Sequence, residues 1–249
     1  MPIVTQIEAR FGWRMAMASI AVPVVLLLAG TFVLPPSPRR PRATVRPHPL
    51  AAFRAVLGDG RTRWLLVVLG LNLGIYAGWL VYFGAYTTDV FAASAAVLSV
   101  LFFLSGATEL LANNLTPPLL RRFDAVSVLY VMLASVAVAL LLTGIAVTTI
   151  PAVLLAAIII LNGTASAYIA ANALLLEGEM SHPGAVMSVA SAFIGVGTAL
   201  GPFVAGWALA ATGSFEAAYR TLGLLAPLAM AALWLGTRRR TAVPAIERA

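Results

Sequence analysis

The sequence predicts an all-α integral membrane protein with seven transmembrane helices, and three observations lead to this fold class. Hydrophobic residues make up 61% of the 249-residue chain and charged residues 10%, whereas soluble domains carry about 25% charged residues. Residues 125–176 contain no formally charged side chain, and such a run fits two bilayer crossings of about 20 residues each. The apolar runs are also too long, and alternate too little, for barrel strands of about 10 residues.

Seven apolar runs are each long enough to cross a bilayer. Backbone groups in lipid are satisfied only in helices or closed barrels, so we interpret every run as a helix. Thr148 and Pro151 flank the turn that divides the charge-free stretch into two spans. The predicted spans cover residues 13–34, 64–86, 93–116, 126–148, 151–176, 185–211 and 217–236.

These spans divide the chain into four segments. Residues 1–34 are expected to form an outer segment and the first transmembrane helix, and residues 64–236 a six-helix transmembrane domain. Residues 35–63 between them are interpreted as an Arg/Pro-rich cytoplasmic linker, because its prolines interrupt a helix and its arginines keep it hydrated. Residues 237–249 are interpreted as a basic cytoplasmic tail.

The distribution of arginine predicts the orientation in the membrane. All 16 basic residues are arginines, and 13 of them fall in the linker, in the loop after the third span and in the tail. Only Arg10, Arg14 and Arg220 fall at the opposite ends of the spans. The positive-inside rule therefore places the amino terminus outside and the carboxyl terminus in the cytoplasm, in a multi-pass protein of the plasma (inner) membrane. The first run exceeds a signal-peptide core of about 7–15 residues, which favours a span over a cleaved signal.

Several classes of protein are disfavoured. The absence of cysteine excludes disulfides and thiolate sites, and His48 and His182 lie far apart in loops, so we expect no metal and no cofactor. The net charge of +7 follows from topology, so we expect no nucleic-acid partner. A retinal-binding pump needs an intramembrane lysine, which the sequence lacks. An intramembrane enzyme needs a paired catalytic set, and Glu109 has no second acid in any span, so we do not expect an enzyme.

Polar residues are shared unevenly among the spans. The first, fourth and seventh are nearly free of them, whereas the second, third, fifth and sixth carry asparagine, serine, threonine or glutamate. Because polar groups are costly against lipid, we expect those four spans to line a wet interior. The order suggests two equivalent triplets of helices, and internal repeats of this kind are typical of secondary transporters. Our candidates for lining a substrate path are Asn72, Tyr76, Trp79, Asn113 and Asn162.

Two spans carry regularly spaced glycines, which allow a neighbouring helix to approach closely. In the second span the glycines lie roughly opposite a face of aromatic residues, which either lines a path or packs against other helices. In the sixth span a proline follows the glycines and favours a kink, so this surface serves either bending and sliding or close packing alone. The residues concerned are Gly70, Gly74, Gly78, Gly197, Gly201, Pro202 and Gly206.

The third span holds the only acidic residue well inside a predicted helix. Glu109 shares a face with Ser105 and Asn113. A charged carboxyl group is costly at that depth, and a group that changes its charge with access to one side at a time is a candidate proton carrier. The alternative is a structural carboxyl that hydrogen-bonds a neighbouring helix or reaches toward Arg121 or Arg122.

Four features together resemble the major facilitator superfamily, in particular its twelve-helix efflux-type members. The motif at residues 11–14 is similar to the entry into that family's sixth helix, and residues 35–63 resemble its linker between two six-helix halves. The cytoplasmic loop at Arg121 and Arg122 sits where the second half carries a basic loop. The glycine–proline pattern at residues 197–206 is similar to the eleventh helix.

This resemblance implies a partial family fold, in which the seven spans correspond to the sixth to twelfth helices and the first five are missing. It implies transmembrane transport of a small organic molecule by alternating access, in the direction of efflux. With Glu109 as the proton-coupling candidate, which its place inside an apolar span indicates, we expect a proton-coupled antiporter. The implied partners are the lipid bilayer, the substrate, protons and the missing N-terminal half. The alternative is a truncated non-transporting remnant, or a half-transporter subunit that needs a partner.

Overall fold

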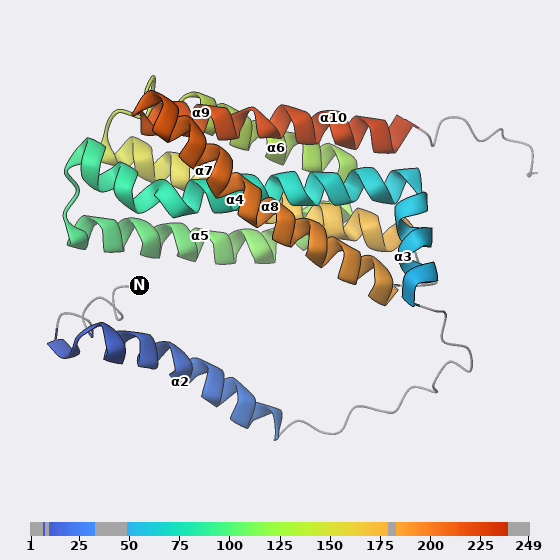
Figure 1. Ribbon diagram of the computed structural model, residues 1–249, viewed down its shortest axis with the longest axis horizontal. Coiled ribbons are helices and arrows are strands. Elements are labelled where there is room, and N and C mark those ends of the chain that lie inside the picture. The colour runs from blue at the N-terminus through green and yellow to red at the C-terminus, as the bar shows by residue number, and fades with distance from the viewer. Residues whose placement is uncertain (1–6, 8–9, 33–48, 179–182, 239–249) are drawn as a thin grey trace, which may run out of the picture.

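The computed structural model describes residue 7 and residues 10–32, 49–178 and 183–238 (Figure 1). Within these ranges the chain is helical and has no β-strand, apart from one isolated bridge between Thr143 and Val147. The helices are α2 (Trp13–Thr31), α3 (Pro49–Gly58), α4 (Gly60–Phe91), α5 (Ala95–Arg122), α6 (Ala125–Leu141), α7 (Ile150–Gly178), α8 (Pro183–Thr212), α9 (Phe215–Gly223) and α10 (Leu225–Thr237).

The length and composition of these helices agree with the predicted class. Among the described residues, six helical stretches are long and apolar enough to cross a membrane, with α9 and α10 counted together as one. α6 is also apolar but has only 17 residues. The prediction of an all-helical protein with membrane-compatible helices is therefore confirmed, and the count of seven spans stays a prediction.

Two of the predicted spans are shorter or broken in the structure. α6 ends at Leu141, before the chain turns at Gly144, whose φ of 78° lies in the left-handed region that glycine adopts readily. The last predicted span is interrupted between Gly223 and Leu225. Pro227 explains this break, because it has no N–H to donate to the carbonyl of Gly223 and its ring crowds that carbonyl.

Side-chain caps fix where several helices begin. Asp59, Ser94, Asp124 and Ser214 each accept a hydrogen bond from the backbone N–H three residues further on. At α4 the carboxylate of Asp59 lies 2.7 Å from the backbone nitrogen of Thr62. Burial by itself would raise the pKa of Asp59, but hydrogen bonds from Thr62 and the nearby Arg61 outweigh it, so this pKa lies below its ordinary value.

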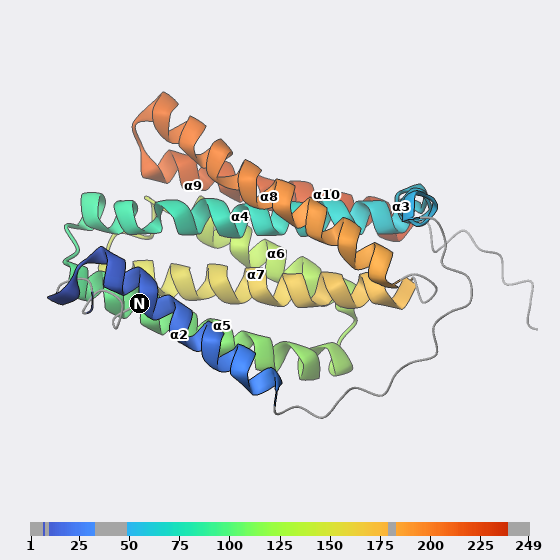
Figure 2. The same ribbon diagram turned by 60° about the horizontal axis from the view of Figure 1, so that its bottom comes forward.

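α4 lies at the centre of the bundle. It packs most extensively against α8, then against α10 and α7, and it barely contacts α5. α5 packs instead against α7, and α6 packs against α7, α9 and α10. Figure 2 shows α4 between α8 and α10 on one side and α7 and α5 on the other.

The glycine stripes of α4 and α8 face each other, so that the two backbones touch. A Cβ atom added to Gly197 would overlap the backbone of Gly70, and one added to Gly201 would overlap the backbone of Gly74. Gly78 also faces the backbone of Gly201. Only glycine permits this approach, because any larger residue would push the helices apart.

Further along α8, a tyrosine of α4 covers the remaining part of the glycine–proline pattern. The hydroxyl of Tyr82 donates to the backbone oxygen of Pro202 at 3.4 Å and occupies the space above Gly206. Pro202 lies inside α8 without ending it.

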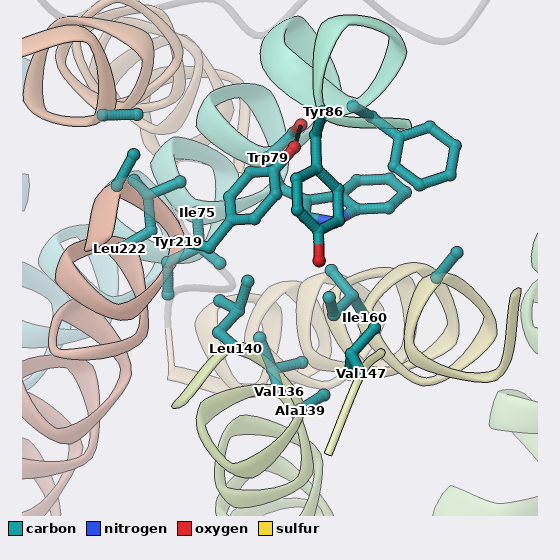
Figure 3. Packing of buried hydrophobic residues seen from close by; sticks show 14 of the residues in the cluster. Ile75, Trp79, Tyr86, Val136, Ala139, Leu140, Val147, Ile160, Tyr219 and Leu222 are labelled. Carbon is teal, nitrogen blue, oxygen red and sulfur yellow. Dashed lines mark hydrogen bonds between the residues drawn. The ribbon is translucent and has the colours of Figure 1, made fainter. Parts of the chain in front are cut away.

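Two clusters of buried hydrophobic side chains form the core. The first contains the buried aromatic residues of α4 and α9 (Figure 3). The ring centroids of Trp79 and Phe83 are 4.5 Å apart, and those of Tyr86 and Tyr219 are 5.1 Å apart. The second cluster is aliphatic and includes Leu66, Leu69, Leu129, Leu133 and Leu175.

The helices α2 and α3, which precede α4, differ in how they contact the rest of the bundle. α2 stands apart from the other helices in Figure 1, and only 6% of its span is buried. α3 lies inside the predicted linker, where it packs against α8 and buries Val56. The predicted linker before residue 49 and the predicted tail after Arg238 lie outside the described residues.

Candidate functional site

One pocket in the bundle collects polar groups from three helices. It has a volume of about 270 Å³ and lies between α4, α5 and α7. Tyr76, Glu109 and Asn113, all singled out from the sequence, line it together. We call it the central pocket, and its other lining residues are Leu73, Thr164, Ala165 and Tyr168.

The central pocket lies half way along the helices that form it. Glu109 is 14 residues after the start of α5 and 13 residues before its end. Thr164 is 14 residues from either end of α7. At 1.5 Å per residue, both lie about 20 Å from the helix ends. Because these helices are long enough to cross a membrane, the pocket would lie at mid-depth, where secondary transporters bind their substrates.

Glu109 is half-buried and is the only acidic group that lines the central pocket. Within the ranges that the structure describes, Glu109 forms no ion pair, since the one recorded there joins Arg61 and Glu177 at 3.9 Å. Arg122 lies 13 residues beyond Glu109 on α5, or about 20 Å along the helix axis. That separation excludes the pairing with Arg121 or Arg122 that the sequence left open.

Asn72 lies behind the wall of the central pocket, in the contact between α4 and α7. It is 1% exposed, and its Nδ2 donates to the backbone oxygen of Thr164 at 3.0 Å. Its Oδ1 has no hydrogen-bond partner in the structure. Asn72 therefore supports the backbone beneath Thr164 and does not itself line the central pocket.

The other two candidates for the path lie elsewhere. Trp79 is 3% exposed and belongs to the aromatic core, where Tyr219 donates to its backbone oxygen at 3.4 Å (Figure 3). Asn162 lines a different groove, between α5, α6 and α7, and its Nδ2 donates to the backbone oxygen of Ile158 at 2.7 Å. The structure thus brings Tyr76, Glu109 and Asn113 together and leaves Trp79 and Asn162 apart from them.

The sequence predicted that the fifth span, which is α7, lines the interior, but the residue chosen on it, Asn162, lies on the wrong face for the central pocket. Thr164 and Tyr168, one turn apart, line it, whereas Asn162 and Ser166 lie on the face that forms the other groove. Spacing alone could have separated the two faces, because residues four apart share a face and residues two apart do not. Which of the two faces meets α4 depends on the tertiary packing.

Two further polar groups are buried without a partner near the aromatic core. Ser105 lies one turn before Glu109 on α5 and is 1% exposed, and its Oγ makes no hydrogen bond. The hydroxyl of Tyr86 is likewise unpaired, and Figure 3 shows it pointing toward Ile160. Buried polar groups of this kind commonly bind ordered water.

Arginines lie at opposite ends of the bundle, as the alternating directions of the helices require (Figure 1). Arg61 is the second residue of α4, and Arg121 and Arg122 are the last two residues of α5, at the same end of the bundle. Arg220 lies at the other end, where its Nε donates to the backbone oxygen of Thr143 at 3.0 Å.

No protein-family model matches the chain, and no curated protein matches it. The likeness to the major facilitator superfamily therefore stays a prediction from sequence motifs. Among the described residues, no group of three or more histidine, cysteine or acidic side chains could hold a metal ion.

Proposed function

We propose that this chain takes part in the transmembrane transport of a small organic molecule, as a proton-coupled secondary transporter that works by alternating access. The observation that carries the proposal is the central pocket. Among the acidic residues that the structure describes, only Glu109 lies far from a helix end, and the pocket places it beside two tyrosines and an asparagine, about half way along α5. Unpaired acidic residues at such depth are rare and usually functional.

The lining of the central pocket favours an organic cation as substrate. Glu109 is its only ionisable acid, and Tyr76 and Tyr168 offer aromatic faces that attract positive charge. A cation and a proton would compete for the same carboxylate, so binding of one would release the other. Alternation of access would then couple their movement in opposite directions. The export direction rests on the resemblance to efflux-type members of the major facilitator superfamily.

The contact between α4 and α8 supports a moving bundle. α4 contributes Tyr76 to the central pocket, and it contacts α8 through backbone atoms of glycine residues. Such a contact carries few side chains that would have to repack, so small sliding movements of the helices meet little resistance. Alternating access needs this kind of movement around a fixed site.

The proposal is tested with ethidium as the probe cation. The chain is reconstituted in vesicles that carry a pH gradient, and ethidium flux and proton flux are both recorded. We expect proton-driven ethidium flux in the parent and its loss in Glu109→Gln, because the amide cannot exchange a proton. Asn114→Ala is the matched control, because Asn114 lies on the same helix, is exposed and bonds only to its own helix.

Equal proton coupling in Glu109→Gln and the parent would contradict the assignment of Glu109. Loss of flux in Asn114→Ala as well would show that α5 tolerates no substitution, and the effect of Glu109→Gln would then say nothing specific about its carboxyl group.

A half-transporter subunit that needs a partner is a second candidate, and the exposure of α5 favours it. Asn113 lies nine residues before the end of α5 yet is exposed, and Tyr168, which lines the same pocket, is 36% exposed. Polar groups at that depth are costly against hydrocarbon, so water or a second helical element should cover them. If a partner is required, vesicles with the chain alone will show no ethidium flux. The complex that is extracted from the membrane in mild detergent will then be larger than one chain.

A further inference from the structure

We propose that the groove between α5, α6 and α7 binds an anionic phospholipid, with the headgroup at Arg122 and an acyl chain between the helices. The groove has a volume of about 500 Å³ and lies beside the central pocket, and none of the residues that line the central pocket also lines it. We call it the arginine groove. The proposal does not rest on the transport function.

The shape of the arginine groove suits an acyl chain. It extends from Arg122, the last residue of α5, to Ala112, which is ten residues or about 15 Å deeper along the helix. Leu115, Leu119 and Met132 provide apolar walls. Leu115 is 65% exposed, so the groove is open along the side of the bundle that would face lipid.

The polar groups on the floor of the arginine groove already have partners. The hydroxyls of Thr116 and Ser166 lie 2.8 Å apart and are hydrogen-bonded to each other, and Thr116 also lies 2.6 Å from the backbone oxygen of Ala112. The amide nitrogen of Asn162 donates within its own helix. A polar solute would therefore gain little in the depth of this groove, whereas an apolar chain would not leave these groups unpaired.

Charge at the mouth of the arginine groove selects an anionic headgroup. Among the described residues, Arg122 forms no ion pair, and it is exposed at the end of a membrane-length helix. The nearby Asp124 uses its carboxylate to cap α6 through the backbone nitrogen of Ser127, at 3.1 Å. A guanidinium binds phosphate through paired hydrogen bonds, and basic groups between helices at a membrane surface attract anionic lipids.

Native mass spectrometry of the whole chain, released from detergent micelles, tests the proposal. The chain is titrated with phosphatidylglycerol and, separately, with phosphatidylcholine of the same acyl length. We expect the parent to prefer phosphatidylglycerol, and Arg122→Gln to lose roughly fivefold in affinity for it, the effect expected of one arginine near a membrane surface. Affinity for phosphatidylcholine should not change in that variant.

Two further variants make the test specific. Arg121→Gln removes the same charge from the neighbouring position, which is exposed but does not line the arginine groove, and it should lose far less affinity. Leu115→Trp fills the groove from an exposed position and should weaken binding of both lipids. Equal losses in Arg121→Gln and Arg122→Gln would reduce the effect to general surface charge and overturn the proposal. Unchanged binding in Leu115→Trp would overturn it equally.

Discussion

At the scale of single residues, three kinds of position distinguish most of the polar side chains of the long helices. Some hydrogen-bond to their own helix, as Asn114 does with the backbone oxygen of Leu110 at 2.7 Å. Others join two helices, as Asn72 joins the backbone of Thr164. Glu109 belongs to the third kind, because it lines a pocket and has no ion-pair partner among the described residues. Only that third kind has an ionisable group free for a ligand or a proton.

Asp59 provides a residue-scale prediction on pH dependence. Its folded-state pKa lies below the ordinary value, so the stability that its carboxylate provides is complete above the unfolded pKa of about 4 and is lost as the pH falls through the folded pKa. We expect Asp59→Ala to lower the free energy of unfolding at pH 7 by about 1 kcal/mol, as for other N-caps. Thermal unfolding in detergent, followed by circular dichroism at pH 7 and pH 3, measures both effects.

Asp59→Asn is the control for this prediction. Asparagine caps a helix about as well as aspartate but does not titrate. The variant should keep most of its stability at pH 7 and lose less than the parent between pH 7 and pH 3. An identical acid loss in the variant and the parent would show that this cap does not contribute to the pH dependence.

At the scale of helices, the contact between α4 and α8 shows how two sequence patterns complete each other. The stripe at Gly70, Gly74 and Gly78 and the pair Gly197 and Gly201 lie more than a hundred residues apart in the sequence, yet their backbones touch. Each stripe predicts a close approach, and neither identifies its partner. The partner is set by the packing of the other helices around α4.

Substitution of one glycine in this contact should destabilise the bundle. A Cβ at Gly197 meets the backbone of Gly70, which cannot move aside without separating the helices. We expect Gly197→Ala to lower the free energy of unfolding by about 1–3 kcal/mol, the usual cost of overpacking. Reversible unfolding of the purified chain in mixed micelles measures the difference.

Gly195→Ala is the matched control on the same helix. A Cβ at Gly195 meets no atom within 4 Å, so this variant should be neutral or slightly stabilising, because alanine favours helix over glycine. Equal losses at positions 195 and 197 would show that helix propensity, and not the contact with α4, controls stability here.

At the scale of the whole molecule, the six helical stretches and α6 alternate in direction, so each loop lies at one of two ends (Figure 1). Arg61, Arg122 and Arg238 lie at one end, and Arg14 and Arg220 lie at the other. The excess of arginine at the first end is the basis for placing that end in the cytoplasm.

Single-cysteine labelling tests the predicted orientation, and the absence of native cysteine makes the experiment clean. Thr148→Cys places an exposed thiol in the loop between α6 and α7, and Ser127→Cys places one at the arginine-rich end. A membrane-impermeant maleimide should label Thr148→Cys in intact cells. It should label Ser127→Cys only after the cells are permeabilised. The opposite pattern would reverse the orientation.

The candidate site was only partly predictable from the sequence. Glu109, Tyr76 and Asn113 were singled out because each is a polar or amphipathic group in an apolar helix, and the structure brings them to one pocket. Trp79 met the same criterion but is buried in the aromatic core. Tyr168 was missed, because its role depends on which face of α7 meets α4 and α5. A pattern along one helix gives its faces and not its neighbours.

The sequence by itself determined the helical class, the approximate positions of the long helices and the separation of arginine into loops. These depend on local properties, because a bilayer-length apolar run must satisfy its own backbone hydrogen bonds. Only the tertiary structure decided that α8 is the main partner of α4, that α5 packs on α7, and that the central pocket and the arginine groove are separate. The physical reason is that helices of similar hydrophobicity differ in the shape of their surfaces, and partners are selected when those shapes fit together in three dimensions.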